Sequence, residues 1–272
     1  MTRPTHLIIN ADDYGLDPAV NAAVERAHVD GVLTTASLMI GAAAAGDAVE
    51  RAQRLLRLGV GLHLVLADGP AVSPRDTIPD LVDAGGRFGD HMARDGFRFF
   101  FLPRVRRQLA IEIRAQFEAF RATGLALDHV NAHKHFHLHP TVLSLILDIG
   151  RDYGLNAVRL PREPGAALLL APWLALTRRR LRAANVLHND AMFGLSASGA
   201  MDEAALLAAI EKLPPGLSEI YLHPATRRSL TPTMSGYRHD DELAALLSPK
   251  VRDAIAQRGI VTGRWADFVE RR

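Results

Sequence analysis

Short apolar runs alternate with amphipathic, helix-like segments along most of the chain. The apolar runs predict strands at 6–10, 33–40, 60–66, 127–130, 157–160, 187–195, 218–222 and 260–261. Helical spacing of apolar positions predicts helices at 18–30, 42–58, 105–122, 140–153, 202–213 and 240–257. Strands that alternate with helices are typical of β–α units around a parallel sheet. The pattern therefore predicts an α/β fold, a distorted β/α (TIM-like) barrel of about seven strands, with an open doubly wound sheet as the alternative.

Residues 67–103 interrupt this rhythm. The segment holds four pairs of residues that break regular structure, namely Gly69-Pro70, Ser73-Pro74, Ile78-Pro79 and Gly85-Gly86. An irregular stretch of this length inside a compact domain is usually a functional loop. We therefore expect a single domain over residues 1–272, with an irregular loop or lid inserted at 67–103.

Composition narrows the class of protein. The 272 residues are 48% hydrophobic and 23% charged, which is ordinary globular composition and excludes disorder. The absence of cysteine excludes a disulfide framework, thiolate metal sites and a cysteine nucleophile. Because 32 basic and 30 acidic residues nearly balance and no recognised motif is present, we expect no nucleic-acid partner. The chain lacks a signal-peptide pattern and any apolar run of about 18 residues, so the expected location is the cytoplasm.

Ionisable side chains stand at the ends of four apolar runs. Asp12 and Asp13 follow the first run, and His63, His133 and His223 close three later ones. In an α/β barrel the carboxyl ends of the strands converge on one face, where active sites are built. The predicted fold would therefore bring these chain-distant groups together.

An aspartate and two histidines can hold one divalent ion and leave positions open for water and substrate. The second aspartate could then accept a proton from the attacking water, and a separate histidine could protonate the leaving group. Together these groups predict a metal-assisted hydrolase. Two imidazoles suit zinc, but the carboxylate leaves magnesium, manganese, iron and cobalt open; zinc or magnesium is the first expectation.

Five of the twelve histidines fall at odd positions between His129 and His139. If this run is extended throughout, all five share one face. Five like side chains would repel one another when protonated, so metal or substrate binding is favoured, although not by all five. The other candidate residues could instead have a purely structural role. Asp12 and Asp13 could start a helix, His63 could be a buried core residue, and His223 could end a strand.

The chain resembles the YdjC/ChbG-like family of carbohydrate deacetylases. The resemblance spans positions 10–224 in the family's order and is carried by Asn10-Ala-Asp-Asp-Tyr-Gly-Leu16, Thr34-Thr-Ala-Ser-Leu-Met39, Gly61-Leu-His-Leu64, His129-Val-Asn-Ala-His-Lys-His-Phe-His137 and Leu222-His-Pro224. The amino-acid sequence around the histidine run is most similar to that of the hopanoid-biosynthesis-associated HpnK branch. Asn131 and Lys134 depart from the chito-oligosaccharide branch, which argues against chitobiose-type substrates.

The resemblance implies a distorted β/α barrel that removes an N-acetyl group from an amino sugar with the help of one divalent metal ion. It maps the metal ligands onto Asp13, His63 and His133. It makes Asp12 the general base, although the two aspartates could exchange roles, and His223 the general acid. The remaining assignments are Arg159 as the group that orients the base, and His135, His137 and Tyr237 as sugar-binding or supporting residues.

Two segments combine apolar residues with clustered arginines, at 97–107 and at 166–182. Such segments can lie at a membrane interface, and the apolar part of the second, eleven residues long, is too short to cross a bilayer. The alternative is a core helix with a solvated basic end. We expect the substrate to be an N-acetylated glycan or glycolipid, and the glycolipid could be built on a hopanoid-type lipid. We also expect peripheral contact with a membrane and a homo-oligomer.

Two other readings fit part of the pattern. One is a different metal hydrolase on a barrel, of the amidohydrolase or LamB/YcsF-like type; amidohydrolases usually carry His-x-His on their first strand, where this chain has Asp12-Asp13. The other is a protein that binds a metal or a sugar through the histidine run without turnover. Release of acetate from an N-acetylated sugar separates both from a deacetylase.

Overall fold

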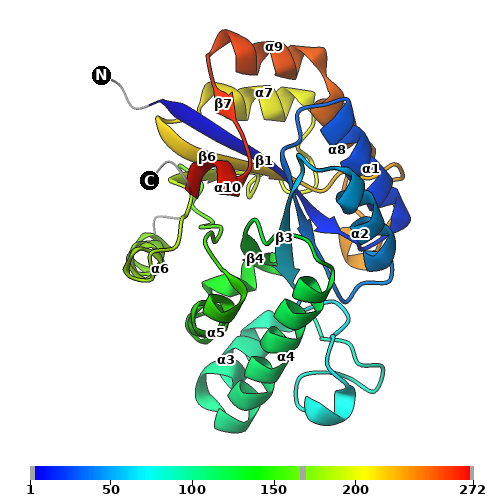
Figure 1. Ribbon diagram of the computed structural model, residues 1–272, viewed down its shortest axis with the longest axis vertical. Helices are drawn as coiled ribbons and strands as arrows, with labels where there is room; N and C mark the ends of the chain where they lie inside the picture. Colours follow the sequence, from blue (N-terminus) through cyan, green and yellow to red (C-terminus); the bar gives the residue numbers. More distant parts are fainter. Residues whose placement is uncertain (1–3, 166–169, 270–272) are drawn as a thin grey trace.

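A curled, all-parallel sheet forms the centre of the computed structural model, which describes residues 4–165 and 170–269 (Figure 1). The strands follow the order β4-β3-β2-β1-β6-β5, and β7 pairs with the first part of β1. Their bounds are β1 (Thr5–Tyr14), β2 (Thr35–Leu38), β3 (Gly59–Leu64), β4 (Val130–Ala132), β5 (Ala191–Phe193), β6 (Gly216–Leu222) and β7 (Val261–Thr262).

Single-residue bridges connect the two edges of this sheet. Val158 pairs in parallel with Val130 of β4, and its neighbour Ala157 pairs with Leu187, just ahead of β5. The expected strand at 157–160 is therefore wrong as a regular element, although the segment still lies between the two edges. The result is a distorted TIM-like barrel, as the alternation of strands and helices predicts.

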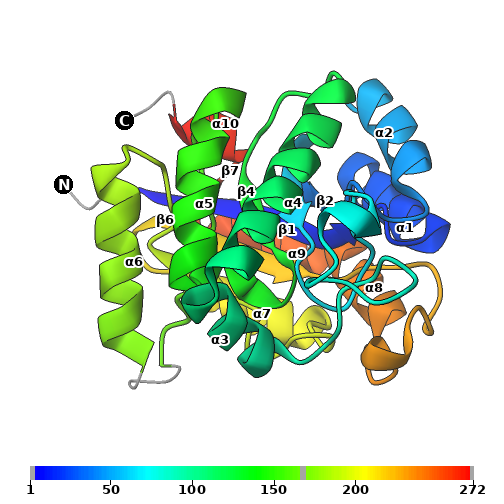
Figure 2. The ribbon, with the colours of Figure 1, turned by 90° about the horizontal axis from the view of Figure 1, so that it is seen from below.

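Helices surround the sheet, with α4, α5 and α6 side by side on one flank and α1 and α2 on another (Figure 2). No helix within the two described ranges is both long and apolar enough to span a bilayer. The α-helices are α1 (Pro18–Val29), α2 (Ala45–Arg54), α3 (Met92–Phe101), α4 (Pro103–Ala122), α5 (Pro140–Gly150), α6 (Ala171–Ala183), α7 (Glu203–Glu211), α8 (His239–Leu247), α9 (Pro249–Gln257) and α10 (Trp265–Val269).

Two helical expectations need correction. Helix α3 lies inside the segment 67–103 that was expected to be irregular, and it buries Gly96 and Phe99. The single helix expected at 240–257 is two helices, because Ser248 caps α9 by accepting from the N–H of Val251 and Pro249 begins that helix. Proline has no N–H for a helical hydrogen bond, so α8 ends before it.

Strand β1 shows how the barrel interior changes from apolar to polar. Leu7 and Ile9 belong to the main core, between sheet and helices, whereas Ile8 packs inside the barrel in a smaller cluster with Trp265. Since alternate residues of a strand share a face, Asn10 and Asp12 lie on the same side as Ile8. The interior is thus closed by apolar side chains at one end and polar towards the carboxyl end of the strand.

Candidate active site

The end of β1 presents two carboxylates to one place. Asp13 has a φ of 63°, in the left-handed region, and the pairing with β2 shifts between Ala11 and Tyr14. Consecutive residues of a regular strand point to opposite faces, so this break in the strand lets both side chains reach the same histidine. Oδ1 of Asp12 and Oδ1 of Asp13 lie 3.8 and 3.4 Å from nitrogens of His63.

Asp13, His63 and His133 form a candidate metal site, and all three are buried. The triangle of donor atoms has sides of 3.1 Å from Asp13 Oδ1 to His133 Nδ1, 3.4 Å from Asp13 Oδ1 to His63 Nε2, and 3.4 Å between the two nitrogens. Zinc bonds of about 2.0–2.1 Å in a tetrahedron place neighbouring ligand atoms about 3.3 Å apart. The three side chains therefore already have the spacing of ligands around one ion.

Two further observations fit an ion at this place. Oδ2 of Asp13 is buried and has no hydrogen-bond partner within the described residues. A buried carboxylate oxygen without a partner is costly, and a cation removes the cost. Burial raises the pKa of this carboxyl, but the neighbouring His133 and His63 outweigh burial and hold the pKa well below its usual range. Asp13 is therefore ionised, as a metal ligand has to be.

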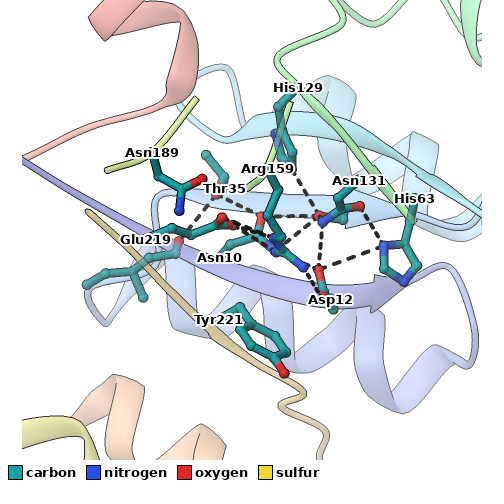
Figure 3. A network of polar contacts seen from close by, with 12 residues as sticks. Asn10, Asp12, Thr35, His63, His129, Asn131, Arg159, Asn189, Glu219 and Tyr221 are labelled. Carbon is teal, nitrogen blue, oxygen red and sulfur yellow. Dashed lines mark hydrogen bonds and ion pairs between the residues drawn. The ribbon is translucent and has the colours of Figure 1, made fainter. Parts of the chain in front are cut away.

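Asn131 orients His63. Its Oδ1 lies 2.6 Å from Nδ1 of His63, and its Nδ2 donates to Asp12 Oδ1 and to Ser37 Oγ (Figure 3). Because an amide oxygen only accepts, Nδ1 of His63 carries a proton, and Nε2 is the nitrogen that would turn its electron pair to an ion beside Asp13 and His133. Burial lowers the pKa of His63, but the charges of Asp12 and Asp13 reverse the effect and raise it.

Asp12 is held by a fully buried arginine. Arg159 donates to its two carboxylate oxygens over 2.6 and 3.0 Å and to Glu219 over 2.8 and 3.0 Å (Figure 3). Burial raises the pKa of Asp12, yet the charge and hydrogen bonds of Arg159 hold it well below its usual range. Burial also opposes the charge of Arg159, but the two carboxylates raise its pKa further. Asp12 is thus ionised in the resting protein and has a fixed orientation.

The histidine run does not continue the strand as an extended segment. Residues 133–138 form the 3₁₀ helix η2, with Lys134 and His135 at φ values of 53° and 55°. His137 does not line the cavity of the candidate site, and its Nδ1 accepts the N–H of Ala132. Burial, with a smaller effect of Arg159, lowers the pKa of His137 to about 3, so the ring is neutral. The condition under which the five histidines would share one face, an extended run, is therefore not met.

His133, His135 and His223 line a common cavity of about 280 Å³ together with Asp12 and His63. The walls also include Tyr221 of β6, Lys134 of η2 and residues from the loops that follow β3, β5 and β6, namely Asp68, Leu195, Ser198, Thr233, Met234 and Tyr237. This volume suits a sugar ring more than a long chain. A larger hollow of about 1110 Å³ at the amino ends of the strands contains none of the expected site residues.

His223 stands between two aromatic rings at the end of β6. The ring centroids of Tyr221 and Tyr237 lie 5.4 and 5.1 Å from its own. The hydroxyl of Tyr221 lies 3.3 Å from Nε2 of His135, and the guanidinium of Arg159 lies 4.9 Å from the Tyr221 ring. Tyr221 therefore connects the loop of the histidine run to the arginine behind Asp12.

Sequence reasoning missed several polar residues that support the site. They are Asn10, Ser37, Asn131, Glu219 and Tyr221. The available signal was their spacing, because Asn10, Asn131 and Tyr221 each lie two residues before an expected site residue and so share its face of the strand. Lys134 and Asp68, an ion pair of 2.8 Å in the cavity wall, carry no comparable signal.

Comparison with known proteins places this geometry in a family. The profile of the YdjC-like protein family matches residues 6–257, and the chain belongs to that family. A protein of Brevibacillus brevis named carbohydrate deacetylase is 30% identical, over 93% of this chain and 96% of its own. A protein of Geobacillus stearothermophilus with the same name is also 30% identical, over 97% and 98%.

A solved structure shows the same fold. It belongs to a protein of Enterococcus faecalis V583 that is provisionally described as a cellobiose-phosphate cleavage protein. The two chains superpose with a TM-score of 0.79 at 27% sequence identity, over 97% of this chain and 99% of the other. The curled sheet and its surrounding helices are therefore an arrangement that an experimental structure shares.

Proposed function

We propose that this protein is a metal-dependent carbohydrate deacetylase that removes the N-acetyl group of an amino sugar. The observation that carries the proposal is the convergence of a ligand triangle, an arginine-held carboxylate and a histidine at one end of the barrel. Membership of the YdjC-like family and the name of its relatives, carbohydrate deacetylase, support it. The name of these relatives favours a deacetylase over the two alternatives, another barrel hydrolase or a binding protein without turnover.

The residues have distinct tasks in this reaction. A divalent ion held by Asp13, His63 and His133 would act as a Lewis acid towards the acetamide carbonyl and would acidify water. Asp12 accepts the proton of the attacking water, since Arg159 keeps it ionised and oriented. His223 donates a proton to the amine nitrogen as the C–N bond breaks, so that acetate and the free amino sugar leave.

The central test joins metal analysis to acetate release. The purified protein should contain about one divalent ion per chain and release acetate from N-acetylglucosamine conjugates. Asp13→Asn should lose the ion and the activity together. Asp12→Asn and His223→Ala should keep the ion and lower kcat by roughly 10²–10⁴-fold. Full activity in both of these variants would refute the roles of Asp12 and His223, and metal-loaded protein that releases no acetate would refute the function.

For the substrate we propose an amino sugar carried on a lipid, of the hopanoid type that the similarity to the HpnK branch implies. Support comes from a ridge of exposed apolar side chains on and after α3, made of Phe97, Phe100, Phe101 and Leu102. On the buried side of α3, Phe99 packs against Phe136 of η2 at 5.2 Å, so the ridge adjoins the loop that carries His133 and His135. The exposed Arg106 and Arg107 follow the ridge and suit an anionic lipid surface.

The second segment contributes less to this proposal. Residues 166–169 lie outside the described residues. In α6, Trp173 donates to the carbonyl of Leu138 and Arg180 donates to the carbonyl of Pro140. These side chains attach α6 to the start of α5. The contacts favour the alternative reading of this segment, a packed helix with a solvated basic end, over a membrane-binding segment.

Liposome sedimentation tests the ridge. The native protein should sediment with anionic vesicles at low salt, and the double variant Phe97→Ser, Phe101→Ser should not. Leu56→Ser is the matched control, because Leu56 is 84% exposed and lies outside the ridge. Faster acetate release from a glycosylated hopanoid than from the same free sugar is the expected substrate preference. Equal sedimentation of all three proteins would remove the membrane proposal and leave the deacetylase proposal intact.

A further inference from the structure

Helix α8 holds the main chain of His223 on both sides. The N–H of His223 donates to Oε2 of Glu242, and its carbonyl oxygen lies 2.5 Å from Nδ1 of His239. Because a carbonyl oxygen only accepts, Nδ1 of His239 carries the proton of this hydrogen bond. Glu242 and His239 are both fully buried, so neither contact exchanges with solvent.

The side chain of His223 has no comparable anchor. Its Nδ1 is buried without a hydrogen-bond partner in the part of the chain that the structure describes, and its ring contacts are the aromatic rings of Tyr221 and Tyr237. A histidine that transfers protons is usually oriented by a carboxylate or carbonyl on its second ring nitrogen. In His223 the orientation has to come from the backbone and the two flanking rings.

Glu242, which accepts the N–H of His223, also links other parts of the barrel wall. Oε1 of Glu242 accepts the N–H of Met201, 3.0 Å away, so the carboxylate joins the end of β6 to the segment before α7. Helix α8 also packs against α1 and α7. A buried carboxylate that accepts two backbone N–H bonds is fully satisfied and fixes the groups around it.

We propose that Glu242 and His239 are positioning residues that set the imidazole of His223 for proton donation to the leaving amine. This inference rests on the proposed deacetylase function. A displacement of about 1 Å in a catalytic group can cost about 100-fold in rate. Neither side chain lines the cavity, so loss of an anchor should lower kcat and leave KM nearly unchanged.

Substitutions at His239 test the proposal. His239→Phe keeps a ring and removes the donor, and kcat should fall about 10- to 100-fold while KM stays within about threefold. His239→Asn keeps an N–H donor near the position of Nδ1 and should recover most of the loss. The matched control is His28→Phe, because Nδ1 of His28 also hydrogen-bonds to a backbone carbonyl, that of Leu33 at 2.9 Å, outside the cavity. Its kcat should equal that of the native protein.

A double-mutant cycle with His223→Ala separates the inference from the function on which it rests. If the anchor acts through His223, His239→Phe should lower kcat no further in the His223→Ala background. An additive loss, or native kcat in His239→Phe, would overturn the positioning role while the acid role of His223 stands. Native kcat in His223→Ala would refute the acid role itself. Glu242→Gln probes the second anchor in the same cycle, with metal content and melting temperature measured for every variant.

Discussion

Arg159 is a buried cation whose charge is balanced by two carboxylates from different strands. It donates to Asp12 on β1 and to Glu219 on β6, and its own side chain is fully buried. Removal of one partner from a buried ion group leaves uncompensated charge and costs about 3–5 kcal/mol. The arginine therefore stabilises the barrel and orients Asp12 at the same time.

Arg159→Met should lower the free energy of unfolding by about 3–5 kcal/mol, measured by urea denaturation at pH 7, because Asp12 and Glu219 would face each other without a cation. Adding Glu219→Gln should restore part of the loss. Arg258→Met, at an exposed position after α9, is the control and should change the free energy by less than about 0.5 kcal/mol. Equal losses at the two positions would contradict this account of the buried charges.

His137 makes stability depend on pH. Its folded-state pKa of about 3 lies below the ordinary value of 6.5, because burial and the charge of Arg159 disfavour the protonated ring. The unfolded chain then binds the proton more readily, so the stabilisation is complete above pH 6.5 and is lost as the pH falls towards 3. Between pH 6.5 and 5 the loss should be about 2 kcal/mol.

The comparison of native protein with His137→Asn isolates this effect. Asparagine keeps an acceptor near the position of Nδ1 for the N–H of Ala132 and has no proton to gain. Urea denaturation of chelator-treated protein at pH 6.5 and 5 should therefore show the smaller loss of stability in the variant. Equal losses would mean that folded His137 binds its proton as readily as the unfolded chain.

Residues at strand ends could be predicted from the sequence, whereas their supports could not. Asp12, His63 and His223 each close an apolar run, and the convergence of strand ends in a barrel supplies the rest of the argument. Glu219 lies within β6 and Asn131 within β4; the spacing of Asn131 indicates which face it shares, but neither residue type indicates its partner. Their contacts join strands that are distant in sequence, and only the closed sheet brings them together.

At the scale of elements, Gly61 of β3 leaves room for the ring of His129, the residue before β4. A Cβ built on Gly61 would lie 2.4 Å from the ring of His129, and that ring is fixed between Ser37 and Asp128 by hydrogen bonds of 3.0 Å. The ring cannot move without breaking both bonds. Glycine at this position therefore lets the His129 ring lie against β3 while the two strands keep their backbone pairing.

Gly61→Ala should destabilise the protein by about 1–3 kcal/mol, because overpacking in a rigid core forces side chains or backbone to move. Gly46→Ala is the matched control: Gly46 lies on α2 with nothing within 4 Å of the added carbon, and alanine favours helices over glycine. The control should be neutral or stabilising by up to about 1 kcal/mol. Urea denaturation measures both, and equal stability of the two variants would contradict the close packing at β3.

Some elements differ from expectation for identifiable reasons. Helix α3 could not be predicted, because the Gly and Pro pairs between 69 and 86 indicated irregular structure for the whole segment 67–103. The histidine run contains Lys134 and His135 in left-handed conformations, which residues other than glycine rarely adopt and which no periodicity indicates. The break at Ser248-Pro249 did carry a signal, an N-cap followed by proline, that the length of the apolar pattern obscured.

At the scale of the whole molecule, one polar network runs through the barrel from its closed end to the site. Asp128 accepts from the backbone N–H groups of Trp265 and Ala266 at the start of α10 and contacts His129. His129 contacts Ser37, which accepts from Asn131, and Asn131 donates to Asp12. The last helix of the chain is thus linked by directional bonds to the carboxylate that we propose as the base.

The same helix closes the barrel with Trp265, which is fully buried against Ile8 and Leu217 and stacks on His129 at 5.7 Å. Trp265→Ala should lower the free energy of unfolding by about 3–5 kcal/mol, since it leaves a large cavity, while kcat of the folded enzyme at 25 °C changes by less than about threefold. The chain has only two tryptophans, so Trp173→Ala, at a half-buried position on α6, is the natural control and should cost less. Urea denaturation and acetate release measure the two quantities on the same samples. A large loss of kcat in Trp265→Ala would contradict the expectation and show that the geometry of the site depends on the packing of Trp265. Equal losses of stability in the two tryptophan variants would show that the barrel does not depend on Trp265 for its stability.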